Sequence, residues 1–96
     1  MINEIHTHNY GGKTSINDWH QHEYSDITSA DSNQVGHIHY LEGNTTFNDG
    51  HIHNYNLQSS PAIYTEGGHY HYYQGNTSIA NMHLHQLEGY TTLYNG

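Results

Sequence analysis

Residues 37–50, HIHYLEGNTTFNDG, contain the pattern that decides the fold. Their first part alternates and is rich in Ile, Tyr and Leu, which predicts a short strand. Residues i and i+2 share one face of a strand, so His37 and His39 point the same way. Glycine, asparagine and aspartate then predict a turn at 42–44, a second short strand at 45–47 and another turn at 48–50. The stretch therefore predicts short strands joined by tight turns.

The same unit occurs six times along the 96 residues. Its form is H-x-H-x-[YL]-x-x-x-[TS]-[TS], with an apolar residue on the histidine face and a hydroxyl pair at a fixed distance. The histidine pairs contain every histidine of the chain: His6/His8, His20/His22, His37/His39, His51/His53, His69/His71 and His83/His85. The apolar residues are Tyr10, Tyr24, Leu41, Tyr55, Tyr73 and Leu87. The hydroxyl pairs are Thr14-Ser15, Thr28-Ser29, Thr45-Thr46, Ser59-Ser60, Thr77-Ser78 and Thr91-Thr92.

The spacing of the units predicts the domain organisation. They begin 14, 17, 14, 18 and 14 residues apart, so short and long steps alternate and two units make one larger repeat. We expect a single domain of three such repeats, at about residues 5–35, 36–67 and 68–96. The expected fold is all-β, with about twelve short strands in a pseudo-threefold prism or barrel, or in a β-solenoid.

Composition indicates that this fold needs a source of stability besides its apolar core. Apolar residues make up 32% of the chain, and Leu, Ile, Val and Phe are as scarce as in disordered sequences. The absence of cysteine excludes disulfides and thiolate metal sites. Metal ions, self-association and the ten tyrosines remain as sources of stability.

The net charge of −8 restricts the partners. Lys13 is the only Lys or Arg, so we expect no binding to nucleic acid and none to an anionic membrane surface. No run of 18 apolar residues is present, so no membrane insertion is expected. The first residues lack the features of a secretory signal, which favours a cytoplasmic protein. An extracellular or spore-surface protein remains the alternative, with its leader removed or with non-classical export.

The histidine pairs predict binding of a divalent transition metal, because neutral imidazole is a common ligand of these ions. If three pairs from three repeats converge, six nitrogens surround one ion, and the chain has two such sets. This arrangement resembles the His-x-His iron sites of trimeric phage tail fibres, where three chains supply what one chain supplies here. If two neighbouring strands pair instead, four imidazoles form a tetrahedral or square site. Imidazole ligands leave Zn, Ni, Cu, Fe and Co open.

Four side chains lie two residues before a histidine pair and share its strand face. A side chain there can orient an imidazole N–H or complete a ligand set. These residues are Glu4, Asp18, Asp49 and Asn81.

Three other interpretations stay open. The histidines can be purely architectural, hydrogen-bonded in ladders along the sheet. The chain ends match in repeat phase, so the repeats either close within one chain or continue between subunits, which would build a filament or a surface or spore layer. Tyr70, Tyr72 and Tyr73 near Trp19 could stack on sugars, although packing in the core is favoured. No residue among the repeats is singled out as a nucleophile, so we do not expect an enzyme.

The chain also resembles a known family. The phrases His37-x-His39…Gly43-x-Thr45-Thr46…Asp49-Gly50-His51-x-His53 and His69-x-His71…Gly75-x-Thr77-Ser78 are similar to the YmaF family of small His-rich bacterial repeat proteins. The resemblance covers essentially the whole chain and implies a bacterial origin, but no activity. Asp26 and Leu57 depart from it, because the family pattern expects glycine before the hydroxyl pair.

Overall fold

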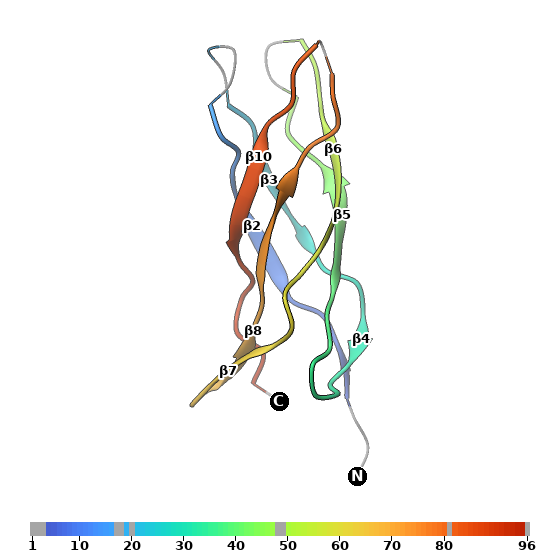
Figure 1. Ribbon diagram of the computed structural model, residues 1–96, viewed down its shortest axis with the longest axis vertical. Coiled ribbons are helices and arrows are strands. Elements are labelled where there is room, and N and C mark those ends of the chain that lie inside the picture. Colours follow the sequence, from blue (N-terminus) through green and yellow to red (C-terminus); the bar gives the residue numbers. More distant parts are fainter. Residues whose placement is uncertain (1–3, 17–18, 20, 48–49, 81, 96) are drawn as a thin grey trace.

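The computed structural model describes residues 4–16, 19, 21–47, 50–80 and 82–95. The molecule is long and narrow, with Cα extents of 49 × 20 × 16 Å (Figure 1). It is all-β, as expected, and the described residues form ten strands. They are β1 (Ile5–His6), β2 (Asn9–Lys13), β3 (Glu23–Ile27), β4 (Asp31–Ser32), β5 (Tyr40–Asn44), β6 (Asn54–Gln58), β7 (Ile63–Thr65), β8 (Gly68–Tyr70), β9 (Tyr72–Asn76) and β10 (Gln86–Tyr90).

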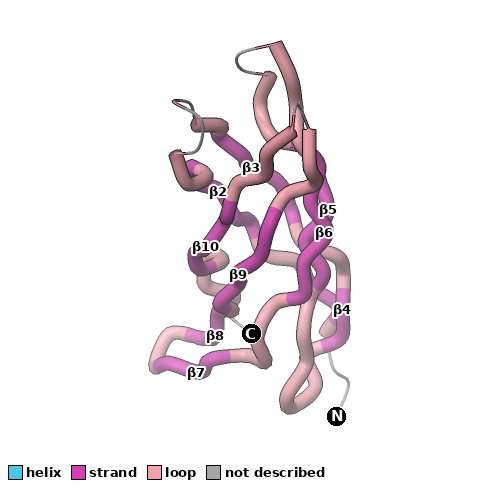
Figure 2. Tube along the Cα trace, turned by 45° about the horizontal axis from the view of Figure 1, so that its top comes forward, coloured by secondary structure: helices cyan, strands magenta, loops and turns pink. Residues whose placement is uncertain are grey.

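The strands of the described residues pair as five antiparallel two-stranded sheets, with no closed barrel. Three hairpins, β2–β3, β5–β6 and β9–β10, lie side by side along the long axis (Figures 1 and 2). The described residues that follow β2, β5 and β9 lead to the upper end of the molecule (Figure 1). The short pairs β1–β4 and β7–β8 lie at the lower end, near both termini. Each large repeat expected from the sequence contains one hairpin.

The expected turn at residues 42–44 is wrong, since β5 runs without interruption through Tyr40–Asn44. The expected strand at 45–47 is wrong as well, and the expected turn residues 48 and 49 lie outside the described residues. Gly43 lies within the strand. The residue is glycine because a Cβ there would be only 2.7 Å from the Tyr55 hydroxyl oxygen. Gly89 is in the same position against Tyr73, at 2.6 Å. These glycines therefore make room for a tyrosine ring rather than a turn.

The hydroxyl pairs connect the hairpins. In each pair the first hydroxyl oxygen accepts the backbone N–H of the second histidine of a pair; for Thr14 and His22 the N···O distance is 3.1 Å. The second residue donates its backbone N–H to a neighbouring hairpin, as Thr46 does to the carbonyl of Glu23 at 2.8 Å. Both interactions recur in all six units. Backbone groups that would face an open edge are thus satisfied between hairpins.

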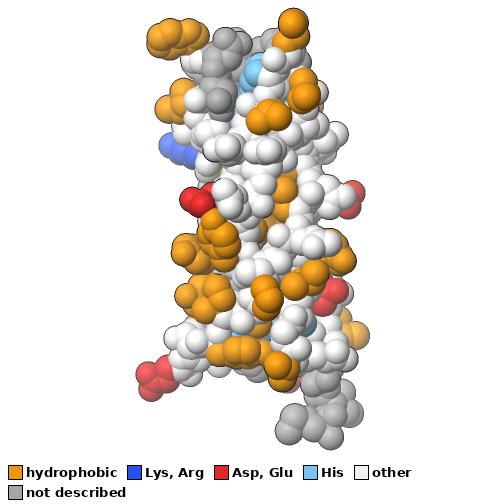
Figure 3. Space-filling model, in the orientation of Figure 1, with side chains coloured by type: hydrophobic (Ala, Val, Ile, Leu, Met, Phe, Trp, Pro, Cys, Tyr) orange, Lys and Arg blue, Asp and Glu red, His pale blue; other side chains and the backbone are white. Residues whose placement is uncertain are grey.

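The centre of the molecule is a small core of tyrosine and leucine. All six apolar residues expected on the histidine face are buried, and Leu57 joins them. The hydroxyl groups of Tyr10 and Tyr55 lie 2.9 Å apart, as do those of Tyr24 and Tyr73, so the buried phenols satisfy one another. Charged side chains are sparse on the face drawn in Figure 3. No described helix is long and apolar enough to span a bilayer.

Candidate metal centre

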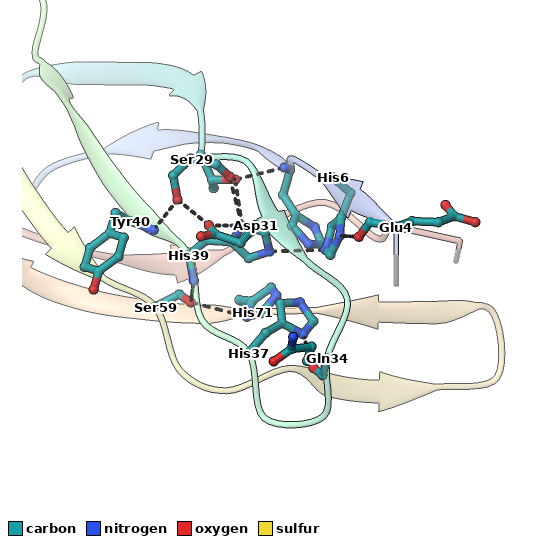
Figure 4. Close-up of polar contacts among 12 residues, drawn as sticks. Glu4, His6, Ser29, Asp31, Gln34, His37, His39, Tyr40, Ser59 and His71 are labelled. Atoms are coloured by element: carbon teal, nitrogen blue, oxygen red, sulfur yellow. Dashed lines mark hydrogen bonds and ion pairs between the residues drawn. The ribbon is translucent and has the colours of Figure 1, made fainter. Parts of the chain in front are cut away.

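Three histidine pairs, one from each large repeat, meet at the lower end of the core. Their ligand atoms all lie within 4.8 Å of one another, and five of the six residues are buried. The pairs stand at the starts of β2, β5 and β9, so the three hairpins bring them together. We call this group the lower cluster: His6, His8, His37, His39, His69 and His71. The imidazoles of His6, His37, His39 and His71 are drawn in Figure 4.

Backbone carbonyls fix the orientation of the rings in the lower cluster. The Nδ1 atom of His8 lies 2.8 Å from the carbonyl oxygen of Thr92, and that of His71 lies 2.9 Å from the carbonyl oxygen of Ser60. A carbonyl only accepts, so Nδ1 carries the proton in each case. His6, His37 and His39 make the corresponding bonds, to Glu4, Gln34 and Ser29. Five of the six imidazoles therefore present Nε2 as a bare lone pair when they are neutral.

These lone pairs converge on one another. Nε2 of His6 lies 3.2 Å from Nε2 of His39. It also lies 3.0 Å from Nε2 of His69, which can donate a hydrogen to it because Nδ1 of His69 has no hydrogen-bond partner among the described residues. Nε2 of His8, His37 and His71 has no hydrogen-bond partner among the described residues. Since the Nδ1 atoms of His6 and His39 hold the protons, their Nε2 contact has no hydrogen to share. A cation between the lone pairs would turn this repulsion into attraction.

Burial keeps His8, His69 and His71 neutral. It is the main cause that lowers the pKa of His8 and His69 to about 4 and that of His71 to about 3. The positive charges that neighbouring histidines would carry add to this effect. Neutral imidazole is the form that binds a metal ion, so the lower cluster is ready to do so at neutral pH.

The upper cluster repeats the arrangement at the other end of the core. Ligand atoms of His22, His51, His53 and His85 lie within 4.8 Å of one another. The Nδ1 atoms of His22, His53 and His85 lie 2.8–2.9 Å from the carbonyl oxygens of a hydroxyl-pair residue. Nε2 of His22 is 3.2 Å from Nε2 of His51. The His83 ring lies beside this group, 4.8 Å from the His51 ring, and His20 lies outside the described residues.

The carboxylates near the lower cluster differ from those expected. Glu4 contacts His6 through its backbone carbonyl, while its side chain accepts a hydrogen bond from Tyr94. Asp18, Asp49 and Asn81 lie outside the described residues. The sequence missed Asp31, whose Oδ2 lies 3.1 Å from Nδ1 of His39 (Figure 4). Asp31 stands two residues after a hydroxyl pair, in the longer connection between repeats, where strand alternation gives no signal.

Tyr94 was also missed, although it closes the lower cluster. Its ring stacks on His6 with centroids 4.2 Å apart, and its backbone pairs with His69. The carbonyl that accepts Nδ1–H from the second histidine of each pair belongs to a hydroxyl pair, which the sequence showed at a constant distance from the histidines. The acceptors of His6 and His37, Glu4 and Gln34, carried no such signal.

The residues considered for sugar stacking are not together. Tyr73 is buried in the core, and Trp19 lies between β2 and β3, whereas Tyr70 lies in β8 and Tyr72 in β9. That grouping was wrong.

Comparisons with known proteins give one match. A family model described as spore germination protein GerY/YamF, named YmaF, matches residues 1–60. Neither curated proteins nor solved structures give a match.

Proposed function

We propose that this chain, which belongs to the YmaF family, binds divalent transition metal ions in its two histidine clusters and is stabilised by them. In this proposal the hairpins form a pseudo-threefold prism, and the ions lie on its axis. The observation that carries it is the convergence of bare Nε2 lone pairs in the lower cluster. The family description refers to spore germination, and we propose that the metal-stabilised protein takes part in that process.

The spacing in the lower cluster favours six-coordination. Neighbouring ligands of an octahedron are separated by the bond length times the square root of two. The Nε2 separations of 3.0 and 3.2 Å therefore correspond to bonds of about 2.1–2.3 Å, near the usual metal–imidazole length. In a tetrahedron the same separations would require bonds of about 1.8–2.0 Å, which is short. Fe, Co and Ni accept six nitrogen ligands and are our first candidates.

The surroundings suit a cation held by neutral ligands. The carboxylate of Asp31 lies beside His39, that of Glu4 is bound to Tyr94 next to His6, and the chain carries a formal charge of −8. Carbonyl bonds at Nδ1 fix the ring orientation and raise the basicity of Nε2, as in known imidazole–metal sites. The buried core is small, so metal binding would add a large share of the folding free energy.

Metal analysis of the purified protein tests the proposal. We expect up to two ions per chain and a fall in melting temperature when EDTA removes them. X-ray absorption of the bound metal would show nitrogen ligands at the octahedral distance. His37→Gln, which changes a half-buried ligand, should lower occupancy of the lower site, and Gln34→Ala is the control because only its backbone carbonyl contacts His37. A metal-free protein that melts unchanged in EDTA and takes up no added Ni, Co, Fe, Cu or Zn would contradict it.

Assembly between copies stays a separate proposal. Negative-stain imaging at high concentration would show filaments, whereas monodisperse single molecules would count against them.

A further inference from the structure

A surface groove lies between the segment of residues 60–63 and the ends of β9 and β10. Its volume is about 840 Å³, within the range of small-ligand sites. Its lining includes Pro61, Ile63, Tyr72, Glu88 and Tyr90. We call it the tyrosine groove. No histidine of either cluster lines it, and Ser60 connects it to the lower cluster through its carbonyl bond to His71.

The tyrosine groove breaks the repeat. Tyr72 and Tyr90 are cross-strand partners at the end of the β9–β10 hairpin. The same pair of positions holds Asn9 and Ile27 in the first hairpin, and Tyr40 and Gln58 in the second. The three hairpins have the same pairing, so the fold does not require two tyrosines here. The position of Glu88 likewise holds Ser25 in the first hairpin and Asn56 in the second.

Tyr90 presents an exposed ring at the groove, and two half-buried tyrosine rings support it at interplanar angles of 54° for Tyr72 and 73° for Tyr70. Tyr90 is 62% exposed, and its ring centroid lies 5.4 Å from that of Tyr72 and 5.6 Å from that of Tyr70. Contacts between the rings restrict their motion, so little side-chain entropy remains to be lost when a ligand binds. An exposed, ordered aromatic face is suited to stack against the C–H face of a pyranose ring.

The polar group of the groove is an acceptor. Tyr72 donates its hydroxyl hydrogen to Glu88 at an Oη···Oε2 distance of 2.5 Å. The carboxylate keeps further lone pairs for ligand hydroxyl groups, which are donors. No Lys or Arg lines the groove, so an anionic ligand would be repelled. We propose that the tyrosine groove binds a neutral oligosaccharide, by stacking on Tyr90 and Tyr72 and by hydroxyl bonds to Glu88.

Titration of the protein as purified tests this proposal, with chitotetraose, cellotetraose and maltotetraose as probes. Binding is followed by the backbone amide shifts of residues 60, 62, 63 and 88–90 in NMR spectra. At least one probe should bind in the millimolar range or better, with the shifts confined to the groove. Tyr90→Ala should weaken binding by about tenfold, or about 1.4 kcal/mol, as expected when an anchoring aromatic is truncated. Glu88→Gln should weaken it less, because an amide oxygen still accepts.

Tyr40→Ala is the matched control, because Tyr40 takes the place of Tyr72 in the second hairpin and lacks a tyrosine partner. It should bind as the unchanged chain does. Failure of all three probes at millimolar concentration would overturn the proposal, and so would equal losses in Tyr90→Ala and Tyr40→Ala. Tetramethylammonium is a further probe. Its binding in place of the sugars would show a site for organic cations and would also overturn the proposal.

Discussion

Acidification of the metal-free protein should destabilise it steeply between pH 7 and pH 5. The pKa of His8 and His69 is lowered to about 4 and that of His71 to about 3, whereas an imidazole in the unfolded chain has a pKa near 6.5. The fold therefore holds these rings neutral. Below pH 6.5 the unfolded chain binds protons that the folded chain does not, so the free energy of unfolding falls as pH falls. The loss ends only when pH passes the folded pKa values.

The lowered pKa values set the size of this effect. Without screening, each of the three histidines would lower the free energy of unfolding by about 1.8 kcal/mol between pH 7 and pH 5. Water around a molecule this narrow screens part of this effect. We therefore expect half of the unscreened value, a fall of about 3 kcal/mol in the free energy of unfolding for the three histidines together. Small domains have total stabilities of about 5–15 kcal/mol, so the loss is a large fraction.

Urea unfolding in the presence of EDTA measures this change. Circular dichroism and tyrosine fluorescence are the signals of choice, because Trp19 is 98% exposed in the fold and its emission should change little. The midpoint should fall from pH 7 to pH 5 with an unchanged m-value. His71→Gln removes one titrating ring and should reduce the pH slope by less than a third, because burial also lowers the pKa of His6, His39 and His53. A free energy of unfolding that stays flat between pH 7 and pH 5 would refute the reasoning.

Three further substitutions test the core, the loops and the carboxylate beside the lower cluster. Leu41→Ala removes a fully buried side chain and should cost about 2–5 kcal/mol in urea unfolding, and a loss below about 1 kcal/mol would count against a core of tyrosine and leucine. Trp19→Gly should stabilise by up to about 1 kcal/mol, because φ of Trp19 is 69° and its side chain buries nothing; a lower urea midpoint would contradict this. Asp31→Asn should weaken metal binding by about 10- to 100-fold in a competition titration, whereas the exposed Glu66→Gln should not.

The repeat predicted the residues of the core and the all-β class, because both follow from alternation along a strand. The histidine and tyrosine or leucine positions share one face, and the structure buries the second histidine of every pair with its apolar neighbour. The prediction of a turn at 42–44 was wrong because glycine occurs both in turns and in strands where another group packs closely against the backbone. In Gly43 the missing Cβ serves close packing against Tyr55, which only the paired strand reveals. Asp31 and Tyr94 could not be found, since they reach the lower cluster from segments outside the repeated unit.

Architectural and metal-binding interpretations of the histidines do not exclude each other, because an imidazole has two nitrogens. Nδ1 of His8, His39 and His71 bonds to a backbone carbonyl of a neighbouring hairpin and so holds the hairpins together. The same bond directs Nε2 inward and leaves it without a proton. A ladder that needed only hydrogen bonds would pair donors with acceptors along its whole length. Here the acceptor Nε2 of His6 faces the acceptor Nε2 of His39 at 3.2 Å, an arrangement that costs energy unless a cation lies between them. The Nδ1–carbonyl bonds that join the hairpins thus leave unprotonated Nε2 atoms facing one another, and a metal ion bound between them would remove their repulsion.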